Sequence, residues 1–336
     1  MKGSRELIMS DNGRSHRYFV KLRPKLQYFL DELSPLYQMS IYTHGTRKYA
    51  EGTCKIMDPE GVYFGKRIVS RSDHPELGAN KSLAQLLKTD WSMVLIYDDR
   101  EDVWKGEQGE HLLCAKPFVH FDPQGKGGVV NNAPGVLSLG ANNPASGEEN
   151  GKVSDEEEDE GLVQAVHIFK KLHQQYFNSV TDGYKVSIGH ILKELRLQIL
   201  DGCVVCFSGV IPTTDKHPER HSMWRTARRL GAVVERVVSE HTTHLLAVCL
   251  GASKTRACLQ RADVFVLHCD WLLHCHWNVE RQQEASYFLS SAHEPALAKD
   301  KVAERAAELQ GAWNKSTQLT TTQYNTSQQI NLMMYV

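Results

Sequence analysis

The chain has 336 residues, of which 41% are hydrophobic and 24% are charged, and its formal net charge is −1. This composition is typical of globular proteins, and the near-zero charge argues against a large basic surface for direct nucleic-acid binding. No apolar run approaches the roughly 18 residues of a membrane span, and the N-terminus lacks the apolar core of a signal peptide. The eight cysteines are scattered rather than spaced as a disulfide framework. We therefore expect a soluble intracellular protein with reduced thiols and no membrane partner.

The first part of the chain alternates short apolar segments with amphipathic ones. Strand patterns at 18–22, 38–42 and 93–97 are separated by helix patterns at 26–36, at 48–57 and from about Lys81 onward. Such alternation is typical of an α/β fold whose strands form a parallel sheet. At this length a second domain is also expected, since domains usually run to about 100–200 residues.

One stretch dominates this first region. It is apolar from Met93 to Tyr97 and then meets two adjacent acids, Asp98 and Asp99. The pattern predicts a strand buried on both faces, with the acids at its carboxyl end, where ligands sit in parallel sheets. Neighbouring carboxylates repel each other unless a hard cation such as Mg²⁺ shares them. An ordinary polar turn after the strand is the alternative interpretation.

The composition changes between residues 123 and 161, where Gly, Asn, Pro and Ser dominate and the acidic run Ser154–Glu160 follows. This segment is predicted to be a disordered acidic linker, with Ser154 as a possible phosphorylation site. Helix patterns at 162–177 and 188–200 precede about 95 residues of alternating strands and helices. The predicted organisation is a first domain at 1–122, the linker at 123–161, a helical connector at 162–196, a second domain at 197–290 and a polar, largely disordered tail at 291–336.

Basic and hydroxyl side chains of the first region lie where a phosphate site needs them. Thr43 ends a predicted strand, in a loop whose hydroxyl and N–H groups suit a phosphate oxygen. Lys81 opens a predicted helix, and Arg23 and Arg71 offer planar, two-pronged donors. Each residue taken singly has a structural explanation, but together they describe a phosphoryl-transfer site without a nucleophile.

The motifs of this region resemble one family, the haloacid-dehalogenase-type phosphatases that act on the C-terminal repeat domain of RNA polymerase II. The resemblance covers about residues 18–122, and its motifs are Lys21–Pro24, Ile41–Ala50, Met57–Gly61, Ser70–Asp73, Asn80–Leu83 and Tyr97–Trp104. It implies that Thr43 binds phosphate, that Lys81 steadies the phosphate and the aspartyl-phosphate, and that Asp98 and Asp99 hold Mg²⁺. It also implies that four further residues support the site or its peptide: Arg23, Tyr49, Asp58 and Arg71.

The sequence departs from this family at one essential motif. The family begins catalysis with Asp-x-Asp-x-Thr, whose first Asp attacks phosphorus, and no Asp-x-Asp occurs in these 336 residues. We therefore expect the sheet to lack its central strand and this chain to be inactive as it stands. We interpret the sequence as a shortened form of a working phosphatase rather than as an evolved non-catalytic relative, because the other motifs are intact.

The second region resembles a BRCT domain, a small α/β module that reads phosphopeptides. The motifs are Gly202–Pro212, Leu230–Ala232, Thr242–Leu245, Leu250–Lys254 and Asp270–Leu272. The resemblance implies a phosphate pocket at Ser208, Gly209 and Lys254, although many such domains serve only as packing modules. We expect Trp271 to lie in the core. The cysteines and histidines of this region also raise the possibility of a zinc site, but Cys203 and Cys206 would face opposite sides of a strand, so core and surface roles explain them better.

The expected protein is thus an incomplete haloacid-dehalogenase-like parallel-sheet domain followed by a BRCT domain. Its expected substrate is the phosphorylated repeat domain of RNA polymerase II, with Mg²⁺ as cofactor, transcription factors as possible partners and the nucleus as location. The alternative is a non-catalytic adaptor that binds phosphopeptides through the second domain. An Asp-x-Asp strand upstream of Met1 would distinguish the two.

Overall fold

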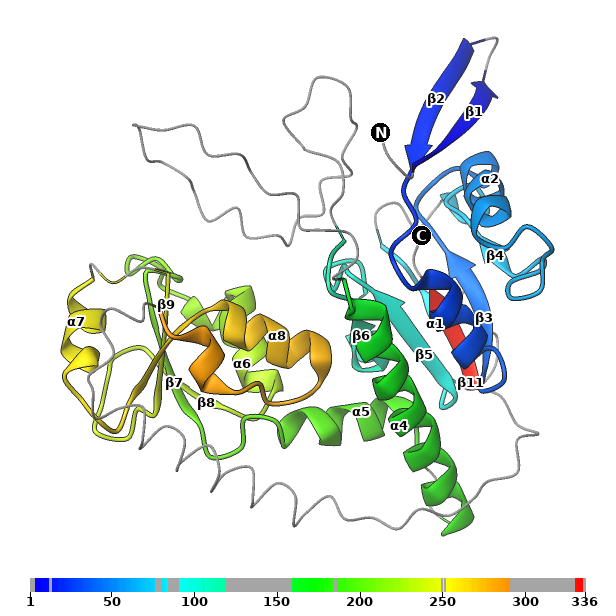
Figure 1. The fold of residues 1–336 in the computed structure, drawn as a ribbon. Helices are drawn as coiled ribbons and strands as arrows, with labels where there is room; N and C mark the ends of the chain where they lie inside the picture. Colours follow the sequence, from blue (N-terminus) through cyan, green and yellow to red (C-terminus); the bar gives the residue numbers. More distant parts are fainter. Residues whose placement is uncertain are drawn as a thin grey trace. The chain divides into compact units, whose positions relative to one another are not determined.

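The computed structural model describes residues 4–11, 14–75, 80–83, 91–104, 106–118, 159–183, 186–248, 250, 252–289 and 330–334. The chain divides into two compact units (Figure 1). The first unit comprises Met1–Leu192 together with Asn325–Val336, and the second comprises Lys193–Tyr324. Helix α5 (Ile188–Leu197) contains the boundary between them. No helix among the described residues combines the length and the hydropathy that crossing a bilayer requires.

A parallel sheet of five strands forms the centre of the first unit, in the order β4-β3-β11-β5-β6. Its strands are β3 (Tyr37–Tyr42), β4 (Ile68–Val69), β5 (Val94–Asp98), β6 (Leu112–Cys114) and β11 (Ile330–Met334). Every residue of β5 is buried, as its apolar sequence predicted. Besides the start of α5, the described helical elements of this unit include α1 (Leu26–Leu33), α2 (Arg47–Met57), α4 (Gly161–Thr181) and the 3₁₀ turn η2 (Gly106–His111).

Aromatic side chains join α1 and α4 to the sheet. Phe169 of α4 is fully buried and makes edge-to-face contacts with Phe29, Tyr37 and Tyr97, at centroid distances of 5.7, 5.4 and 5.3 Å. The Tyr37 hydroxyl donates to the Phe169 carbonyl oxygen at 2.7 Å, so its polar atom is satisfied inside the core. This cluster fixes the helices over β3 and β5, the strands that carry Thr43 and Asp98 at their ends.

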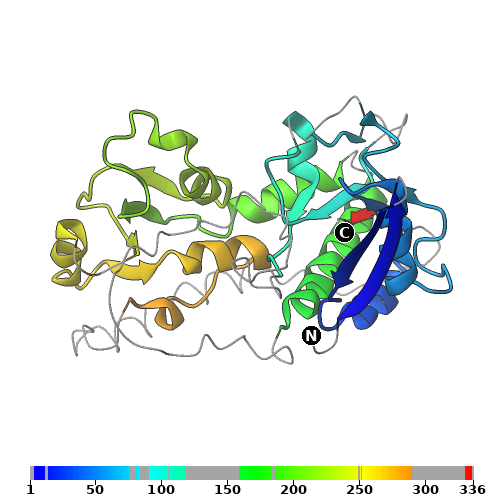
Figure 2. The ribbon, with the colours of Figure 1, turned by 90° about the horizontal axis from the view of Figure 1, so that it is seen from above.

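The N-terminal residues form a hairpin that the sequence analysis did not predict in full. Strand β1 (Arg5–Asp11) pairs antiparallel with β2 (Arg14–Val20) as a separate two-stranded sheet (Figure 2). Only residues 18–22 were predicted as a strand, yet Asn12-Gly13 stands between the strands, and Asn-Gly is a strong signal for a tight hairpin turn.

The second unit has a four-stranded parallel sheet in the order β10-β9-β7-β8. Its strands are β7 (Val204–Ser208), β8 (Val233–Glu235), β9 (His244–Ala247) and β10 (Phe265–His268). Its helical elements are η4 (Pro218–Arg220), α6 (Ser222–Arg229), α7 (Ser253–Leu259), α8 (Asp270–Asn278) and η5 (Glu284–Tyr287). The sequence predicts strands at 203–207, 232–238, 244–248 and 264–267 and helices at 223–230, 254–261 and around Trp271. Each of them has a counterpart in the structure, with bounds shifted by a few residues.

A buried polar network lies at the centre of this second unit. His244 stacks against Trp271 at 4.8 Å and against Phe265 at 5.0 Å. Its Nε2 lies 3.6 Å from Glu284 Oε1, which accepts hydrogen bonds from Arg281 at 2.8 and 2.9 Å. Trp271 is fully buried, so its predicted place in the core is confirmed.

Two expectations for the first unit are corrected by the structure. The central position of the sheet is filled, because β11 lies between β3 and β5. That strand comes from the tail that was predicted to be disordered. The prediction failed because a five-residue segment interrupted by Asn331 gives little local signal for pairing with distant strands. Residues 123–158 of the acidic linker, most of the helix expected after Lys81 and the remainder of the tail fall outside the described residues.

Candidate functional site at the carboxyl edge of the sheet

Strands β3 and β5 end at the same edge of the first sheet, because both run parallel to β11. Thr43 follows β3, and its Oγ1 accepts a hydrogen bond from the Gly45 N–H at 3.1 Å. Its own N–H donates to the Val69 carbonyl oxygen at 2.9 Å, which holds the loop against the end of β4. The Thr43 side chain is 2% exposed, so it faces the interior of this edge rather than open solvent.

A buried ion pair joins Lys81 to Asp98 at this edge. Lys81 Nζ lies 2.6 Å from Asp98 Oδ2, and both side chains are buried. The ammonium also lies 5.4 Å from the ring centroids of Tyr42 and Trp104, close enough for cation–π attraction. Burial lowers the pKa of Lys81, while the charges of Asp98 and Asp99 act to raise it.

The backbone places Lys81 there through a single parallel bridge to Trp104. The Lys81 N–H donates to the Val103 carbonyl oxygen at 2.9 Å, and the Ser82 N–H donates to the Tyr42 hydroxyl at 3.3 Å. Lys81 therefore lies before the helix that was predicted to begin at it. The described part of that helix begins at Leu83. Its ammonium is positioned by strand-like pairing and by aromatic walls.

The two adjacent carboxylates at the end of β5 differ in their partners. Asp98 Oδ2 accepts from Trp104 Nε1 at 2.8 Å as well as from Lys81, and Asp98 Oδ1 accepts from the Arg100 N–H at 3.0 Å. Asp99 Oδ1 is buried and has no hydrogen-bond partner among the described residues. Burial, followed by the charge of Asp98, raises the pKa of Asp99 to about 6. A buried acceptor of this kind suits a hard cation.

His44 connects the loop after β3 electrostatically to this cluster. Burial lowers its pKa, and the positive charges of Lys81 and Arg100 lower it further. Tyr42, which precedes Thr43, contacts both Lys81 and the Ser82 N–H, so the Thr43 loop and the Lys81–Asp98 pair are neighbours at this edge.

Two of the four expected supporting residues are engaged in local structure. Both Asp58 oxygens accept backbone hydrogen bonds from Val62, Tyr63 and Phe64 at 2.8–3.0 Å, so this buried carboxylate organises its own turn. Arg23 donates to Asp159 Oδ2 at 2.8 Å and to the Lys116 carbonyl oxygen at 2.7 Å. The sequence analysis did not predict this two-pronged ion pair with Asp159, which lies at the end of the acidic linker.

The other two supporting residues lie nearer the surface of the Thr43 loop. The Arg71 N–H donates to the Gly45 carbonyl oxygen at 3.1 Å, and the Arg71 residue is exposed. The Tyr49 ring packs edge to face on Tyr18 at 5.6 Å. A Cβ atom on Gly45 would approach that ring to 2.7 Å, so only glycine fits there without displacing the ring.

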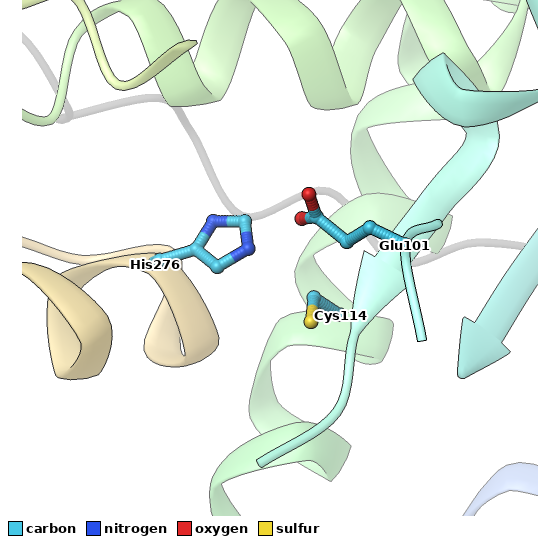
Figure 3. A group of neighbouring side chains, drawn as sticks. All are labelled: Glu101, Cys114 and His276. Carbon is cyan, nitrogen blue, oxygen red and sulfur yellow. The ribbon is translucent and has the colours of Figure 1, made fainter. Parts of the chain in front are cut away.

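Sequence reasoning missed Trp104 as a partner of the acids. It lies six residues after Asp98, inside a motif that was recognised, and an indole N–H at a buried carboxylate is a common pairing that spacing alone does not reveal. Glu101 follows β5, and Cys114 ends β6 (Figure 3). Cys114 Sγ lies 3.9 Å from the Asp99 carbonyl oxygen. His276, also drawn there, lies on α8 of the second unit, and we assign it no role at this edge.

The predicted phosphate pocket of the second unit is built around the end of β7. Ser208 is buried, and its hydroxyl lies 3.1 Å from Thr255 Oγ1. Gly209 adopts a left-handed conformation with φ of +70°. Lys254 Nζ donates to the carbonyl oxygens of Arg236 at 2.7 Å and Phe207 at 3.4 Å. The three residues are thus neighbours, with the ammonium directed at main-chain oxygens.

The cysteines considered for zinc lie in the core of this unit. Cys203 is close to Arg281, with an Sγ-to-Nη1 distance of 3.2 Å, and Cys275 Sγ accepts from the Gln282 N–H at the same distance. Burial raises the pKa of Cys203 to about 11 and that of Cys275 to about 12. All cysteines among the described residues are free thiols.

Comparison with known proteins identifies the first unit. Residues 2–127 match the model of the NLI interacting factor-like phosphatases. This part of the chain is therefore similar to phosphatase domains of this type. The match confirms the predicted resemblance to polymerase-repeat phosphatases, while the roles of the individual site residues stay predictions.

Similarity to curated relatives extends beyond the residues that this model matches. The RNA polymerase II C-terminal domain phosphatase-like 4 of Arabidopsis thaliana is 32% identical over 271 residues, which are 80% of this chain and 58% of that protein. The RNA polymerase II C-terminal domain phosphatase-like 3 of the same plant is 30% identical over 280 residues, which are 81% of this chain and 21% of that protein. The chain spans 21–58% of the length of the first three curated relatives.

A solved structure supports the same fold over both units. The structure of Fcp1, described as an essential RNA polymerase II CTD phosphatase, has 27% sequence identity and a TM-score of 0.67, covering 85% of this chain and 86% of that one. The α/β architecture predicted from the sequence is therefore confirmed.

Proposed function

We propose that this protein is part of a phosphatase that acts on phosphoserine in the C-terminal repeats of RNA polymerase II. The observation that carries the proposal is the buried cluster at the carboxyl edge, where the Thr43 loop, Lys81 and two adjacent carboxylates meet. A hydroxyl, an ammonium and a cation site suit a phosphate ester, which carries its charge on several oxygens. The names of the relatives supply the substrate class.

Each residue of the cluster receives a role from its contacts. Thr43 and the N–H groups of its loop bind a phosphate oxygen, and Lys81 neutralises phosphate charge. Asp98 orients Lys81, since its Oδ2 accepts from the ammonium at 2.6 Å and from Trp104 at 2.8 Å. Asp99, whose Oδ1 lacks a hydrogen-bond partner among the described residues, is the group best placed to hold a cation.

The residues fit Mg²⁺, which Asp99 would hold through its Oδ1, with Asp98 beside it as the second carboxylate. Bound there, Mg²⁺ would offset the negative charge of the phosphate ester. Arg23, Tyr49, Asp58 and Arg71 support this arrangement by shaping the loops. We assign Arg23 and Asp58 to loop support rather than to phosphate binding, because their donors and acceptors are used within the protein.

The chain as given binds and orients a phosphate ester but does not attack it. No Asp-x-Asp occurs in its sequence. The described central strand, β11, contains no Asp or Glu that could act as the nucleophile. We propose that turnover depends on an Asp-x-Asp-x-Thr segment that is not part of these 336 residues.

The second unit is proposed to be a BRCT domain that binds a phosphopeptide at Ser208, Gly209 and Lys254. The Lys254 ammonium donates to the carbonyl oxygen of Phe207, the residue that precedes Ser208, and this proximity favours the second role. It would hold phosphorylated polymerase repeats or a transcription factor near the first unit, and the nucleus is the corresponding location. As a purely non-catalytic adaptor, the protein would use this pocket alone.

The test compares this chain with the protein purified from its own cells, using a phosphoserine peptide of Ser-Pro repeats with Mg²⁺. We expect the 336-residue chain to bind the peptide without releasing phosphate, and Thr43→Val to weaken that binding by about tenfold. We expect peptide mapping of the cellular protein to recover an Asp-x-Asp-x-Thr segment, and that protein to release phosphate. Equal binding of phosphorylated and unphosphorylated peptide, with no turnover by either form, would overturn the proposal.

A further inference from the structure

Strand β11 holds the central position of the first sheet although it comes from the far end of the chain. It pairs in parallel with β3 from Ile330 opposite Tyr37 to Met334 opposite Ile41, and with β5 from Asn331 opposite Val94 to Met334 opposite Tyr97. Figure 1 shows it between these two strands. Strands β3 and β5 are not hydrogen-bonded to each other, so β11 completes both ladders.

One side chain of β11 shows how the strand is held. Leu332 is fully buried, and its register partners are Met39 on β3 and Leu95 on β5, which are also buried. Because in-register neighbours of a sheet share a face, these three apolar side chains form one row across the sheet. A strand that lies between β3 and β5 therefore needs an apolar residue at its middle position.

The sequence of β11 is a poor match to this position in other respects. Central strands of parallel sheets are rich in Val, Ile and Leu, whereas Ile330–Met334 contains one β-branched residue, one Asn and two Met. The strand is joined to the rest of the first unit only through a long excursion of the chain that includes the whole second unit. A short strand with weak β-propensity, connected through a long stretch of chain, can be displaced by another strand.

We propose that the space between β3 and β5 is a strand-insertion site that the chain's own segment Ile330–Met334 occupies in exchangeable form. A parallel strand with an apolar central residue and more β-branched neighbours competes for the same place. The register of β11 ends opposite Ile41 and Tyr97, just before Thr43 and Asp98. The occupying strand thus determines which groups reach the carboxyl edge, and β11 has no acidic side chain to offer there.

The insertion is tested by disulfide trapping in the full chain, with Ser40→Cys and Met333→Cys combined. These residues are register partners on adjacent strands, whose spacing of about 4.8 Å permits a disulfide. The matched control combines Met333→Cys with Ile41→Cys, which faces the other side of the sheet. We expect the first pair to form an intramolecular disulfide, found by peptide mapping of the monomer, and the control pair to form little.

Two outcomes of this trapping would overturn the proposal. A disulfide found only between chains would show that the tail inserts into a second copy instead of its own sheet. Equal yields from the matched and the mismatched pair would show that β11 is not held in this register. Adding Leu332→Asp to the matched pair provides a further check, since a buried charge in the apolar row should abolish the intramolecular disulfide.

Exchange is tested by competition before oxidation. The probe is a synthetic peptide of residues 325–336 carrying Asn331→Val and Met333→Val, used at roughly millimolar concentration to match a tethered competitor. We expect it to reduce the intramolecular disulfide severalfold, and the same peptide with Leu332→Asp to have no effect. An undiminished disulfide yield with the first peptide would show that β11 is a permanent part of the sheet.

Discussion

The two units bury charges in opposite ways. In the second unit, the buried carboxylate of Glu284 faces Arg281 at 2.8 Å and lies 3.6 Å from His244. Burial acts to raise its pKa, but the His244 and Arg281 interactions outweigh burial and lower it to about 2. In the first unit, Asp98 is matched by Lys81, whereas its neighbour Asp99 keeps a buried oxygen without a partner among the described residues, and its pKa rises to about 6.

This difference separates a structural network from a binding site. Where a cationic side chain pairs with each buried carboxylate, ionisation of the carboxylate stabilises the fold. A bound cation would then add no stability. Where one carboxylate is left over, the fold is less stable at neutral pH than it is with that group protonated or bound to a cation. We therefore propose that Asp99 Oδ1, which has no hydrogen-bond partner among the described residues, marks the candidate site more directly than the number of charged residues does.

The largest effect is expected from Lys81→Met. Removing the ammonium leaves Asp98 buried beside Asp99 without its cation, which should destabilise the first unit by about 3–5 kcal/mol. Urea unfolding followed by hydrogen exchange in each unit measures the loss. The double variant Lys81→Met/Asp98→Leu, which also removes the orphaned charge, should recover part of it. A second unit destabilised as much as the first would contradict the account.

A smaller loss is expected from acid in the second unit. Glu284 has a folded-state pKa of about 2, below its ordinary value of 4.5, so its stabilising contribution is present above about pH 4.5 and is lost as the pH falls toward 2. The contribution is of the order of 2–3 kcal/mol. Unfolding of Glu284→Gln should therefore show reduced stability at pH 7 and a flatter dependence between pH 4.5 and 2 than the parent chain shows.

The first unit should respond to acid with the opposite sign. The pKa of Asp99 is raised from its ordinary value of 3.8 to about 6, so the folded state binds a proton that the unfolded chain does not bind between these values. The first unit should gain stability as the pH falls from 7 toward 4. Asp99→Asn should be more stable than the parent at pH 7, by roughly 1 kcal/mol, and should lack this gain. Hydrogen exchange in β5 at pH 7 and 5 reports both effects.

The smallest effect is expected at the surface. Arg47 and Glu51 form an exposed i,i+4 ion pair on α2, with side chains 41% and 54% exposed. Glu51→Ala should change the stability of the first unit by less than about 0.5 kcal/mol. A loss comparable to that of Lys81→Met would show that ion-pair number, rather than burial, governs stability here.

Sequence reasoning recovered what depends on local pattern. The buried run before Asp98, the helices over the first sheet and all four strands of the second sheet follow from periodicity and length. The acids at the end of β5 were predicted from position, because parallel strands end at a common edge. The difference in hydrogen bonding between the two acids was not predictable from the sequence. It arises because Trp104 and Lys81 donate to Asp98 and not to Asp99 Oδ1.

What the sequence hid were contacts between distant segments. Strand β11 pairs with residues nearly 300 positions earlier, as in Leu332 opposite Met39, and such pairing leaves no periodic signal. The Arg23–Asp159 pair likewise joins the start of the first unit to the end of the linker. The β1–β2 hairpin is a different case. Asn12-Gly13 is a recognisable turn signal, but polar and apolar residues alternate only weakly in the two flanking strands, so the hairpin was not predicted.

The most direct test of the account is a Mg²⁺ titration of thermal unfolding at pH 7, resolved for each unit by hydrogen exchange. Three chains are compared: the parent, Asp99→Asn and Glu284→Gln. The account predicts that Mg²⁺ stabilises the first unit of the parent and of Glu284→Gln, by about 3 kcal/mol at a hundredfold excess over the dissociation constant, and leaves Asp99→Asn unchanged. Equal stabilisation of all three chains, or of none, would contradict the claim that the unmatched carboxylate of Asp99 is the cation site.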